Sequence, residues 1–315
     1  KSANSVNNDD SYFVVSFPKS GRTWLRLMIG YTLDRHFNLG ASEEDILELD
    51  PLVKIARKQN VFNFPSLAVD HAKKELELVP RNKWKFPSQF ENSNVVLLIR
   101  DPRDVFVSNW FEKKFRKMGL NKKENDGKGF TADQADKKSA NCSWMSHGAG
   151  LQIYFSKFEA QDDPYCDTVS GTCSCFHPDY TILDFMKEPQ GGFDTICQFS
   201  SFFWQNRQKM NSFLLTKYES LHSDTLGELR RVMKFIGVDA SDKHLKEAVA
   251  EASFNTMRQK ELNGTFGWRL TARNKNDPDT YKTREGKVGA YRQHFDAKTL
   301  QMMEQQMLSI LPKEF

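Results

Sequence analysis

The sequence predicts an α/β fold in which helices flank a central parallel sheet. Two observations favour this class. Short apolar runs followed by polar turns and helical stretches recur along the chain, and these runs are continuously apolar, as in strands buried on both faces. With 315 residues, 39% of them hydrophobic, the chain is long enough to bury a sizeable core. We find no internal repeat and predict a single domain over 1–315, with an insertion at 112–180 that forms surface or ligand-binding loops.

The first predicted strand, residues 12–17, passes through a turn at 18–21 into a helix at about 23–35. The second strand, residues 94–100, is rich in Val, Leu and Ile. It leads into a helix with Asp101 as N-cap and Pro102 as first helical residue.

A third strand at 212–217 precedes a helical stretch at about 224–236, and 300–311 is a helix that packs at the end of the chain. Alternation of strands and helices in this order indicates a parallel sheet covered on both faces.

Charge and hydropathy exclude two classes of protein. Lys and Arg number 45 against 41 Asp and Glu, and a net charge of +4 is small for a protein that binds nucleic acid over its whole surface. The longest apolar run, residues 95–99, is far shorter than the roughly 20 residues of a membrane-spanning helix. We expect no nucleic-acid partner and no membrane span, and any basic site must be local.

The turn at 17–24 has the composition of a phosphate site. It lies between a strand and a helix N-terminus, where backbone N–H groups and the helix dipole favour an anion. Gly21 permits close approach of a ligand to the backbone, Ser20 and Thr23 offer hydroxyl groups, and Lys19 adds a positive charge. Because Lys19 precedes the glycine, the Walker pattern is absent, and no GxGxxG is present.

Two further basic segments follow. Arg100 ends the second strand and Ser108 lies about two helical turns later, so both can face one phosphate near the edge of the sheet. Arg284 precedes Gly286 and Gly289 in a polar loop, which can close over a phosphate with backbone amides and a guanidinium. Anion sites at adjacent strand ends indicate a ligand with two separated phosphates.

In this order and spacing, these segments resemble the motifs of the sulfotransferases that use 3′-phosphoadenosine 5′-phosphosulfate (PAPS). Residues 18–24 resemble the 5′-phosphosulfate loop PKSGTTW, 100–108 the 3′-phosphate segment RNPKDxxxS, and 284–291 the loop RKGxxGxW. Residues 217–221 and 253–257 are similar to the RYEDL and SFxxM segments. The resemblance implies a P-loop-like three-layer sandwich that transfers the sulfuryl group to a hydroxyl or amine of a small-molecule acceptor, without a metal.

The resemblance also implies roles for individual residues. Lys19 would stabilise the charge that grows on the oxygen between phosphorus and sulfur, and Ser108 near Lys19 would restrain futile hydrolysis. The 5′-phosphosulfate would be held by Lys19, Ser20, Gly21, Arg22 and Thr23. The adenine would be bordered by Trp24, Tyr218 and Phe254. The 3′-phosphate would be held by Arg100, Ser108, Arg284 and Gly286.

The family uses a histidine as base, and the resemblance implies His71, where an apolar strand-like run ends. An imidazole, with an ordinary pKa of about 6.5, suits removal of a proton from a hydroxyl at neutral pH. Residues beside His71 differ from the family's, so a structural or surface histidine is the alternative. The other histidines, His222 among them, lack a comparable context.

Three positions depart from the motifs. Arg22 replaces the first Thr of the usual pair, and its charge either tightens phosphosulfate binding or points to solvent. Glu285, within the predicted cofactor-binding loop, stands where Lys or Arg is usual, so we expect weaker cofactor affinity. Tyr291 replaces the Trp of that loop. The KxxxTVxxxE dimer motif is not matched after the loop, which leaves the oligomeric state open.

Four cysteines, Cys142, Cys166, Cys173 and Cys175, lie in the insertion, and Cys197 stands apart. The cofactor loops resemble the cytosolic group, so we predict a cytoplasmic protein, or a lumenal one if these cysteines form disulfides. A targeting segment before Lys1 stays open.

Two alternatives follow. One is a lumenal carbohydrate or peptide sulfotransferase, and the other is a non-catalytic module that binds adenosine bisphosphate or a sulfated glycan. The presence of both Lys19 and His71 argues against the binding module.

Overall fold

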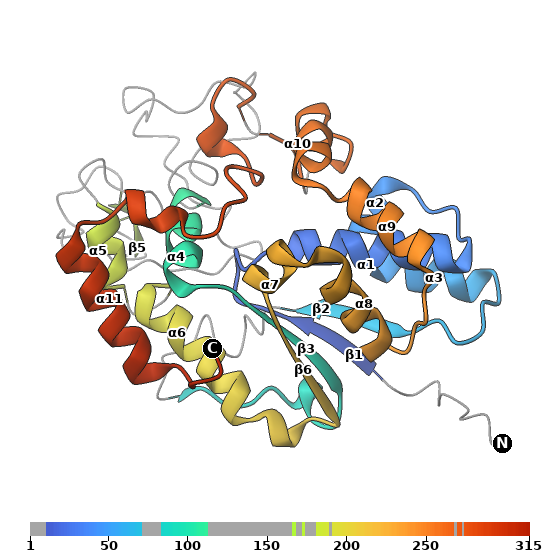
Figure 1. The fold of residues 1–315 in the computed structure, drawn as a ribbon, viewed down its shortest axis with the longest axis horizontal. Helices are drawn as coiled ribbons and strands as arrows, with labels where there is room; N and C mark the ends of the chain where they lie inside the picture. Colours follow the sequence, from blue (N-terminus) through green and yellow to red (C-terminus); the bar gives the residue numbers. More distant parts are fainter. Residues whose placement is uncertain are drawn as a thin grey trace.

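The computed structural model describes residues 11–70, 83–112, 166–167, 172–173, 181–188, 191–267, 270–272 and 274–315. Its centre is a four-stranded sheet with helices on both faces (Figure 1). The strand order is β2–β1–β3–β6 and all three pairings are parallel. The strands are β1 (Ser11–Val15), β2 (Ser66–Asp70), β3 (Asn94–Ile99) and β6 (Ser212–Lys217). The predicted α/β fold with a central parallel sheet is therefore confirmed.

The strand β3 shows why its sequence is continuously apolar. All six of its residues are buried, and successive side chains point to opposite faces of the sheet. Val96 and Leu98 join the core on one face, whereas Val95, Leu97 and Ile99 join the core on the other. A strand covered on both sides has no solvent-facing position at which a polar residue would be favoured.

Two helical layers enclose the sheet (Figure 1). One consists of α1 (Arg22–Phe37), α2 (Glu43–Glu48), α3 (Asp50–Lys58), α8 (Thr225–Phe235) and α9 (Asp242–Glu251). The other consists of α4 (Pro102–Phe111), α5 (Ile182–Met186), α6 (Phe193–Gln205) and α11 (Ala297–Ile310). The remaining elements are α7 (Tyr218–Ser223), α10 (Phe254–Asn263) and an antiparallel pair of β4 (Cys166–Asp167) with β5 (Thr172–Cys173), besides short 3₁₀ turns.

The predicted boundaries hold closely, with one difference after β6. Asp101 caps α4 through its side chain, and Pro102 opens the helix as predicted. Residues after β6 form two helices, because Asp224 ends α7 and accepts a hydrogen bond from the backbone N–H of Gly227 to cap α8. The segment that begins at Tyr218 is thus a short helix, for which the sequence analysis predicted no secondary structure.

The parallel arrangement brings three strand-to-helix connections to one edge of the sheet. β1 leads into α1, β3 into α4 and β6 into α7, and parallel strands place all three connections at their carboxyl ends. This edge is where the segments predicted to bind anions meet.

The predicted insertion at 112–180 lies almost wholly outside the described residues. Glu112 is described, as is the backbone of the β4–β5 pair, where Cys166 is in register with Cys173. Cys142 and Cys175 lie outside the described residues.

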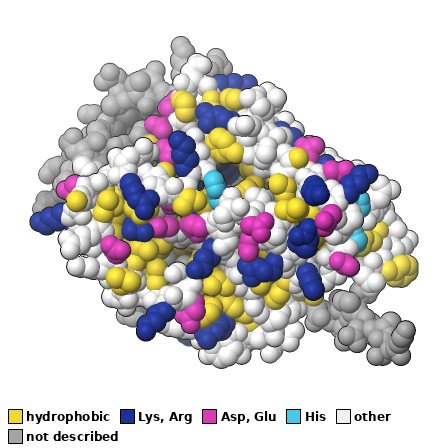
Figure 2. All heavy atoms as spheres, in the orientation of Figure 1, with side chains coloured by type: hydrophobic (Ala, Val, Ile, Leu, Met, Phe, Trp, Pro, Cys, Tyr) yellow, Lys and Arg dark blue, Asp and Glu magenta, His cyan; other side chains and the backbone are white. Residues whose placement is uncertain are grey.

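Among the described residues, no helix is both long enough and apolar enough to cross a membrane. Figure 2 shows acidic side chains interspersed among the Lys and Arg side chains of the visible face. Side chains of both charge signs are thus mixed on this face.

Candidate active site

A cavity of about 540 Å³ collects residues from the three connections, from α10 and from the C-terminal loop at 284–291. It contains the predicted cofactor residues except Ser20, which is buried with 2% of its surface exposed. Those that line it are Lys19, Gly21, Arg22, Thr23, Trp24, Arg100, Ser108, Tyr218, Phe254, Arg284, Glu285 and Gly286. The predicted base, His71, lies outside the described residues.

Among the described residues that line the cavity, six Lys and Arg side chains face three Asp and Glu side chains. A local excess of positive charge favours a ligand with several negative charges. Arg100 adds a specific donor, because its Nε is buried without a hydrogen-bond partner in the described part of the chain. An orphaned guanidinium N–H suits a phosphate oxygen.

The turn between β1 and α1 adopts a backbone that few residues tolerate. Lys19 has φ 74° and Gly21 has φ 95°, and a Cβ on Gly21 would lie 2.4 Å from Cδ2 of Tyr218. The helix α1 begins at this glycine without a side-chain cap and without an acidic residue in its first turn. Its N-terminus therefore presents backbone N–H groups and a positive dipole end to the cavity.

Aromatic rings form another part of the wall. Trp24 and Tyr218 meet edge to face with centroids 5.7 Å apart, and the guanidinium of Arg100 lies 4.2 Å from the Tyr218 centroid. Burial raises the pKa of Tyr218, with Arg100 acting against it. Gly286 lies close to Phe254, since a Cβ there would be 2.5 Å from its ring. These rings offer apolar faces suited to a nucleobase.

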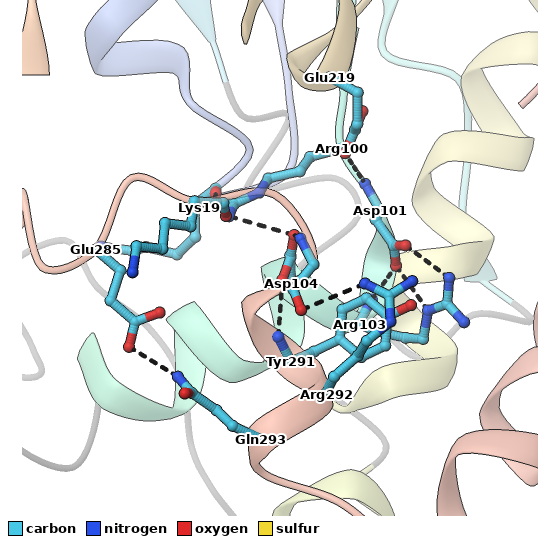
Figure 3. A network of polar contacts seen from close by, with 12 residues as sticks. Lys19, Arg100, Asp101, Arg103, Asp104, Glu219, Glu285, Tyr291, Arg292 and Gln293 are labelled. Atoms are coloured by element: carbon cyan, nitrogen blue, oxygen red, sulfur yellow. Dashed lines mark hydrogen bonds and ion pairs between the residues drawn. The ribbon is translucent and has the colours of Figure 1, made fainter. Parts of the chain in front are cut away.

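Arg100 lies where the strand-to-helix connections meet the C-terminal loop (Figure 3). Its Nη2 donates to the backbone oxygen of Lys287 at 2.9 Å, and its Nη1 donates to that of Lys19 at 3.5 Å. The backbone N–H of Asp101 donates to Glu219 of α7 at 2.9 Å. These contacts join segments that are far apart in the sequence.

Two buried carboxylates hold the C-terminal loop. Asp104 of α4, 2% exposed, accepts from the backbone N–H of Gly289 at 2.8 Å and of Tyr291 at 3.1 Å. Glu261 of α10, 0% exposed, accepts from the backbone N–H groups of Lys282 at 2.8 Å and Thr283 at 2.9 Å. The Thr283 hydroxyl also donates to Glu261, at 2.7 Å. The loop is thus fixed at both ends.

The structure shows the surroundings of the three residues that differ from the family motifs. Glu285 accepts from Nη1 of Arg284 at 2.7 Å and so offsets part of that charge. Burial lowers the pKa of Arg284, with Glu285 acting against it. Tyr291 is buried, and the Arg103 guanidinium lies 4.3 Å from its ring centroid. Arg22 lines the cavity.

Two residues that line the cavity, Glu112 and His222, were not predicted as site residues from the sequence. Nζ of Lys19 donates to Oε2 of Glu112 at 2.9 Å, and Glu112 lies four residues after Ser108, on the same side of a helix. His222 also lines the cavity, four residues after Tyr218 on α7, although its sequence context gave no sign of this. Helical i, i+4 spacing from the motif residues is the signal that could have found both.

The described residues contain no group of three or more His, Cys, Asp and Glu side chains arranged to hold a metal ion.

The chain matches a family model described as "Sulfotransferase domain" over residues 9–161 and 177–309. Sulfotransferase 2B1 of Mus musculus is 25% identical over 257 residues, which are 79% of this chain and 56% of that protein. Cytosolic sulfotransferase 1 of Danio rerio is 22% identical over 301 residues, 91% of this chain and 77% of that protein. The chain thus spans little more than half of the mouse relative.

Two solved structures share the fold. Mouse sulfotransferase SULT7A1 complexed with PAP, the nucleotide without its sulfuryl group, has a TM-score of 0.51 and 14% identity, covering 96% of this chain and 85% of that one. Retinol dehydratase in complex with retinol and PAP has a TM-score of 0.53 and 16% identity, covering 96% and 81%. Because the family model covers most of the chain and its motif residues converge on one cavity, the chain belongs to the family of sulfotransferases that use PAPS.

Proposed function

We propose that this chain transfers a sulfuryl group from PAPS to a hydroxyl or amine of a small-molecule acceptor. One observation supports this most strongly: the positive side chains of Lys19, Arg100 and Arg284 and the rings of Trp24, Tyr218 and Phe254 line one cavity. A bisphosphorylated adenosine needs both kinds of surface. When bound, PAPS supplies the sulfuryl group and a nucleotide leaving group.

The cavity residues suit this ligand on structural grounds. Gly21 and Gly286 leave space where a Cβ would meet an aromatic ring, so the backbone and rings form a cradle. The uncapped N-terminus of α1 and Lys19 would hold the 5′ side, while Arg100 and Arg284 would hold the 3′-phosphate. Ser20 would contribute through its backbone, since its side chain does not line the cavity.

Lys19 would stabilise the negative charge that develops on the bridging oxygen as its bond to sulfur breaks. His71 would take the proton of the acceptor hydroxyl or amine, so the acceptor gains the sulfuryl group and the nucleotide leaves as PAP. Ser108 lines the cavity with Arg100 and Arg284, the residues that would hold the 3′-phosphate. It would keep Lys19 from acting before the acceptor arrives. His71 belongs to this scheme through the family resemblance.

The acceptor class is a further part of the proposal. Retinol in the complex of retinol dehydratase is a small molecule, which supports an acceptor of similar size here. A cytoplasmic location is supported by relatives named as cytosolic. Oxidised cysteines at 142–175 would favour a lumenal carbohydrate or peptide sulfotransferase instead.

The test is transfer of ³⁵S from PAPS onto phenols, alkaloids, steroids and glycans, with EDTA present, alongside calorimetric titration with PAP. We expect PAP binding and metal-independent transfer by the wild type. His71→Ala should lose transfer and keep PAP binding. PAP binding without transfer to any acceptor would support the binding module, and absence of both would contradict the proposal.

A further inference from the structure

The end of the cavity that would hold the 3′-phosphate has a carboxylate beside each of its two guanidinium groups. Nη2 of Arg100 lies 3.5 Å from Oδ2 of Asp104, and Nη1 of Arg284 donates to Oε1 of Glu285 at 2.7 Å. The same Glu285 oxygen accepts from Gln293 at 3.2 Å, and Figure 3 shows the carboxylate directed at that side chain. These charges largely cancel, whereas a bound phosphate group brings about two negative charges of its own.

The backbone of Lys287 is fixed next to this end of the cavity. Lys287 lines the cavity, and its carbonyl oxygen accepts from Nη2 of Arg100 at 2.9 Å. The N–H of Gly289 donates to Asp104 at 2.8 Å, and the left-handed φ angles of Gly286 and Gly289 turn the loop on either side of the lysine. Since a lysine ammonium stands on a flexible four-carbon stem, it can reach an anion bound at Arg100.

The charge of Lys287 is not offset in the way that the two guanidinium charges are. Lys287 is exposed, and within the part of the chain that the structure describes its ammonium forms no ion pair or hydrogen bond. Glu285, in the same loop, is engaged by Arg284, and Asp104 accepts from backbone N–H groups of the loop. The Lys287 ammonium is therefore available to a negatively charged ligand.

On the basis of the proposed function, we propose that Lys287 binds the 3′-phosphate of the nucleotide and replaces the cation that Glu285 removes from the loop. The motif RKGxxGxW has its second cation directly after the arginine, and here a lysine follows the glycine instead. Lys287 then distinguishes nucleotides with a 3′-phosphate from those without one. Because an ammonium binds a phosphate as a point charge, its contribution should depend on its charge more than on an exact geometry.

The experiment measures the affinity of the whole chain for PAP and for adenosine 5′-monophosphate (AMP), which lacks the 3′-phosphate. Calorimetric titration gives the first affinity and displacement of PAP gives the second, for the wild type, Lys287→Met and Lys287→Arg. Lys58→Met is the matched control, since Lys58 is an exposed lysine that does not line the cavity. We expect Lys287→Met to weaken PAP binding by about 3- to 10-fold, as for a partly exposed ion pair, and to leave AMP binding nearly unchanged.

Lys287→Arg keeps the charge and should retain most of the PAP affinity, and Lys58→Met should match the wild type for both nucleotides. Glu285→Lys gives a second comparison, because it returns a positive charge to the position at which the motif has one. In that background Lys287→Met should cost less PAP affinity than in the wild type, since another cation then shares the phosphate. This difference does not depend on whether Glu285→Lys by itself raises or lowers the affinity.

A folded Lys287→Met protein that binds PAP as tightly as the wild type would overturn the inference. Equal losses of affinity for PAP and AMP would overturn it too, because Lys287 would then act on the shape of the loop. So would an equal cost of Lys287→Met with and without Glu285→Lys, since the two positions would then serve different groups. These results leave the proposed function standing, because the wild type still binds PAP. A wild type that binds no PAP and transfers to no acceptor would overturn the proposed function itself, and the inference with it.

Discussion

The buried carboxylate of Glu261 should control nucleotide affinity although it lies outside the recognised motifs. It accepts three hydrogen bonds, from the Lys282 and Thr283 backbones and the Thr283 hydroxyl. A glutamine at this position keeps one acceptor oxygen and directs an NH₂ group at the Lys282 N–H. With about 1.5–3 kcal/mol for each hydrogen bond to a charged group, and an unmatched donor in addition, the expected loss is about 2–4 kcal/mol.

This loss acts on the base of the loop that carries Arg284. PAP has to order the loop when it binds, and we expect about half of this free-energy loss to act on that step. PAP affinity should then fall by about tenfold, since 1.4 kcal/mol corresponds to a factor of ten. The assay is calorimetric titration of Glu261→Gln with PAP, together with the KM for PAPS and for the acceptor. The KM for PAPS should rise in parallel, and the KM for the acceptor should stay near that of the wild type.

Thr283→Val is the matched control, because it removes the hydroxyl donor and leaves both backbone hydrogen bonds to Glu261. Its PAP affinity should fall by less than that of Glu261→Gln. A folded Glu261→Gln protein that binds PAP within threefold of the wild type would refute the view that this carboxylate positions the loop.

Three other predictions concern separate features. Gly21→Ala should weaken PAP binding by at least about tenfold, because a left-handed backbone costs a non-glycine residue about 1–2 kcal/mol and the new Cβ meets Tyr218; unchanged affinity in titration would contradict this. Burial, and then His244, lower the pKa of His36, so below about pH 6.5 the unfolded chain binds more protons than the folded one and stability decreases as the pH is lowered. Between pH 7.5 and 5.5 the melting temperature should therefore fall less for His36→Gln than for the wild type, and equal falls would count against this. The register of Cys166 with Cys173 predicts a disulfide in protein made in an oxidising compartment, seen as a loss of about 2 Da in intact mass; protein from an oxidising host with all thiols free would disprove it.

Much of the fold followed from the sequence because its strands carry a strong signal. The run at 94–100 is continuously apolar since both faces of β3 are covered, and Asp101 and Pro102 mark the start of α4. The turn at Lys19 to Thr23 could be predicted as part of the site because its glycine and hydroxyl residues lie together in the chain, and it does line the cavity.

The rest of the site depended on contacts between distant segments, which local sequence does not encode. Glu261 lies 21 and 22 residues before the backbone groups that it holds, and Glu112 lies 93 residues after Lys19. Glu261 has no distinctive neighbour in the sequence, and the spacing of Glu112 from Ser108 does not reveal its pairing with Lys19. His222 was missed because α7 was not assigned as a helix, so its position on the same side as Tyr218 was not apparent.

The most direct test of the account is ³⁵S transfer from saturating PAPS by the wild type and by Lys19→Ala, with PAP affinity measured for both proteins. The account predicts transfer by the wild type and a decrease of about 100- to 1000-fold in kcat for Lys19→Ala, with PAP still bound. Equal turnover by the two proteins would contradict the assignment of Lys19 to the leaving oxygen and with it the central claim.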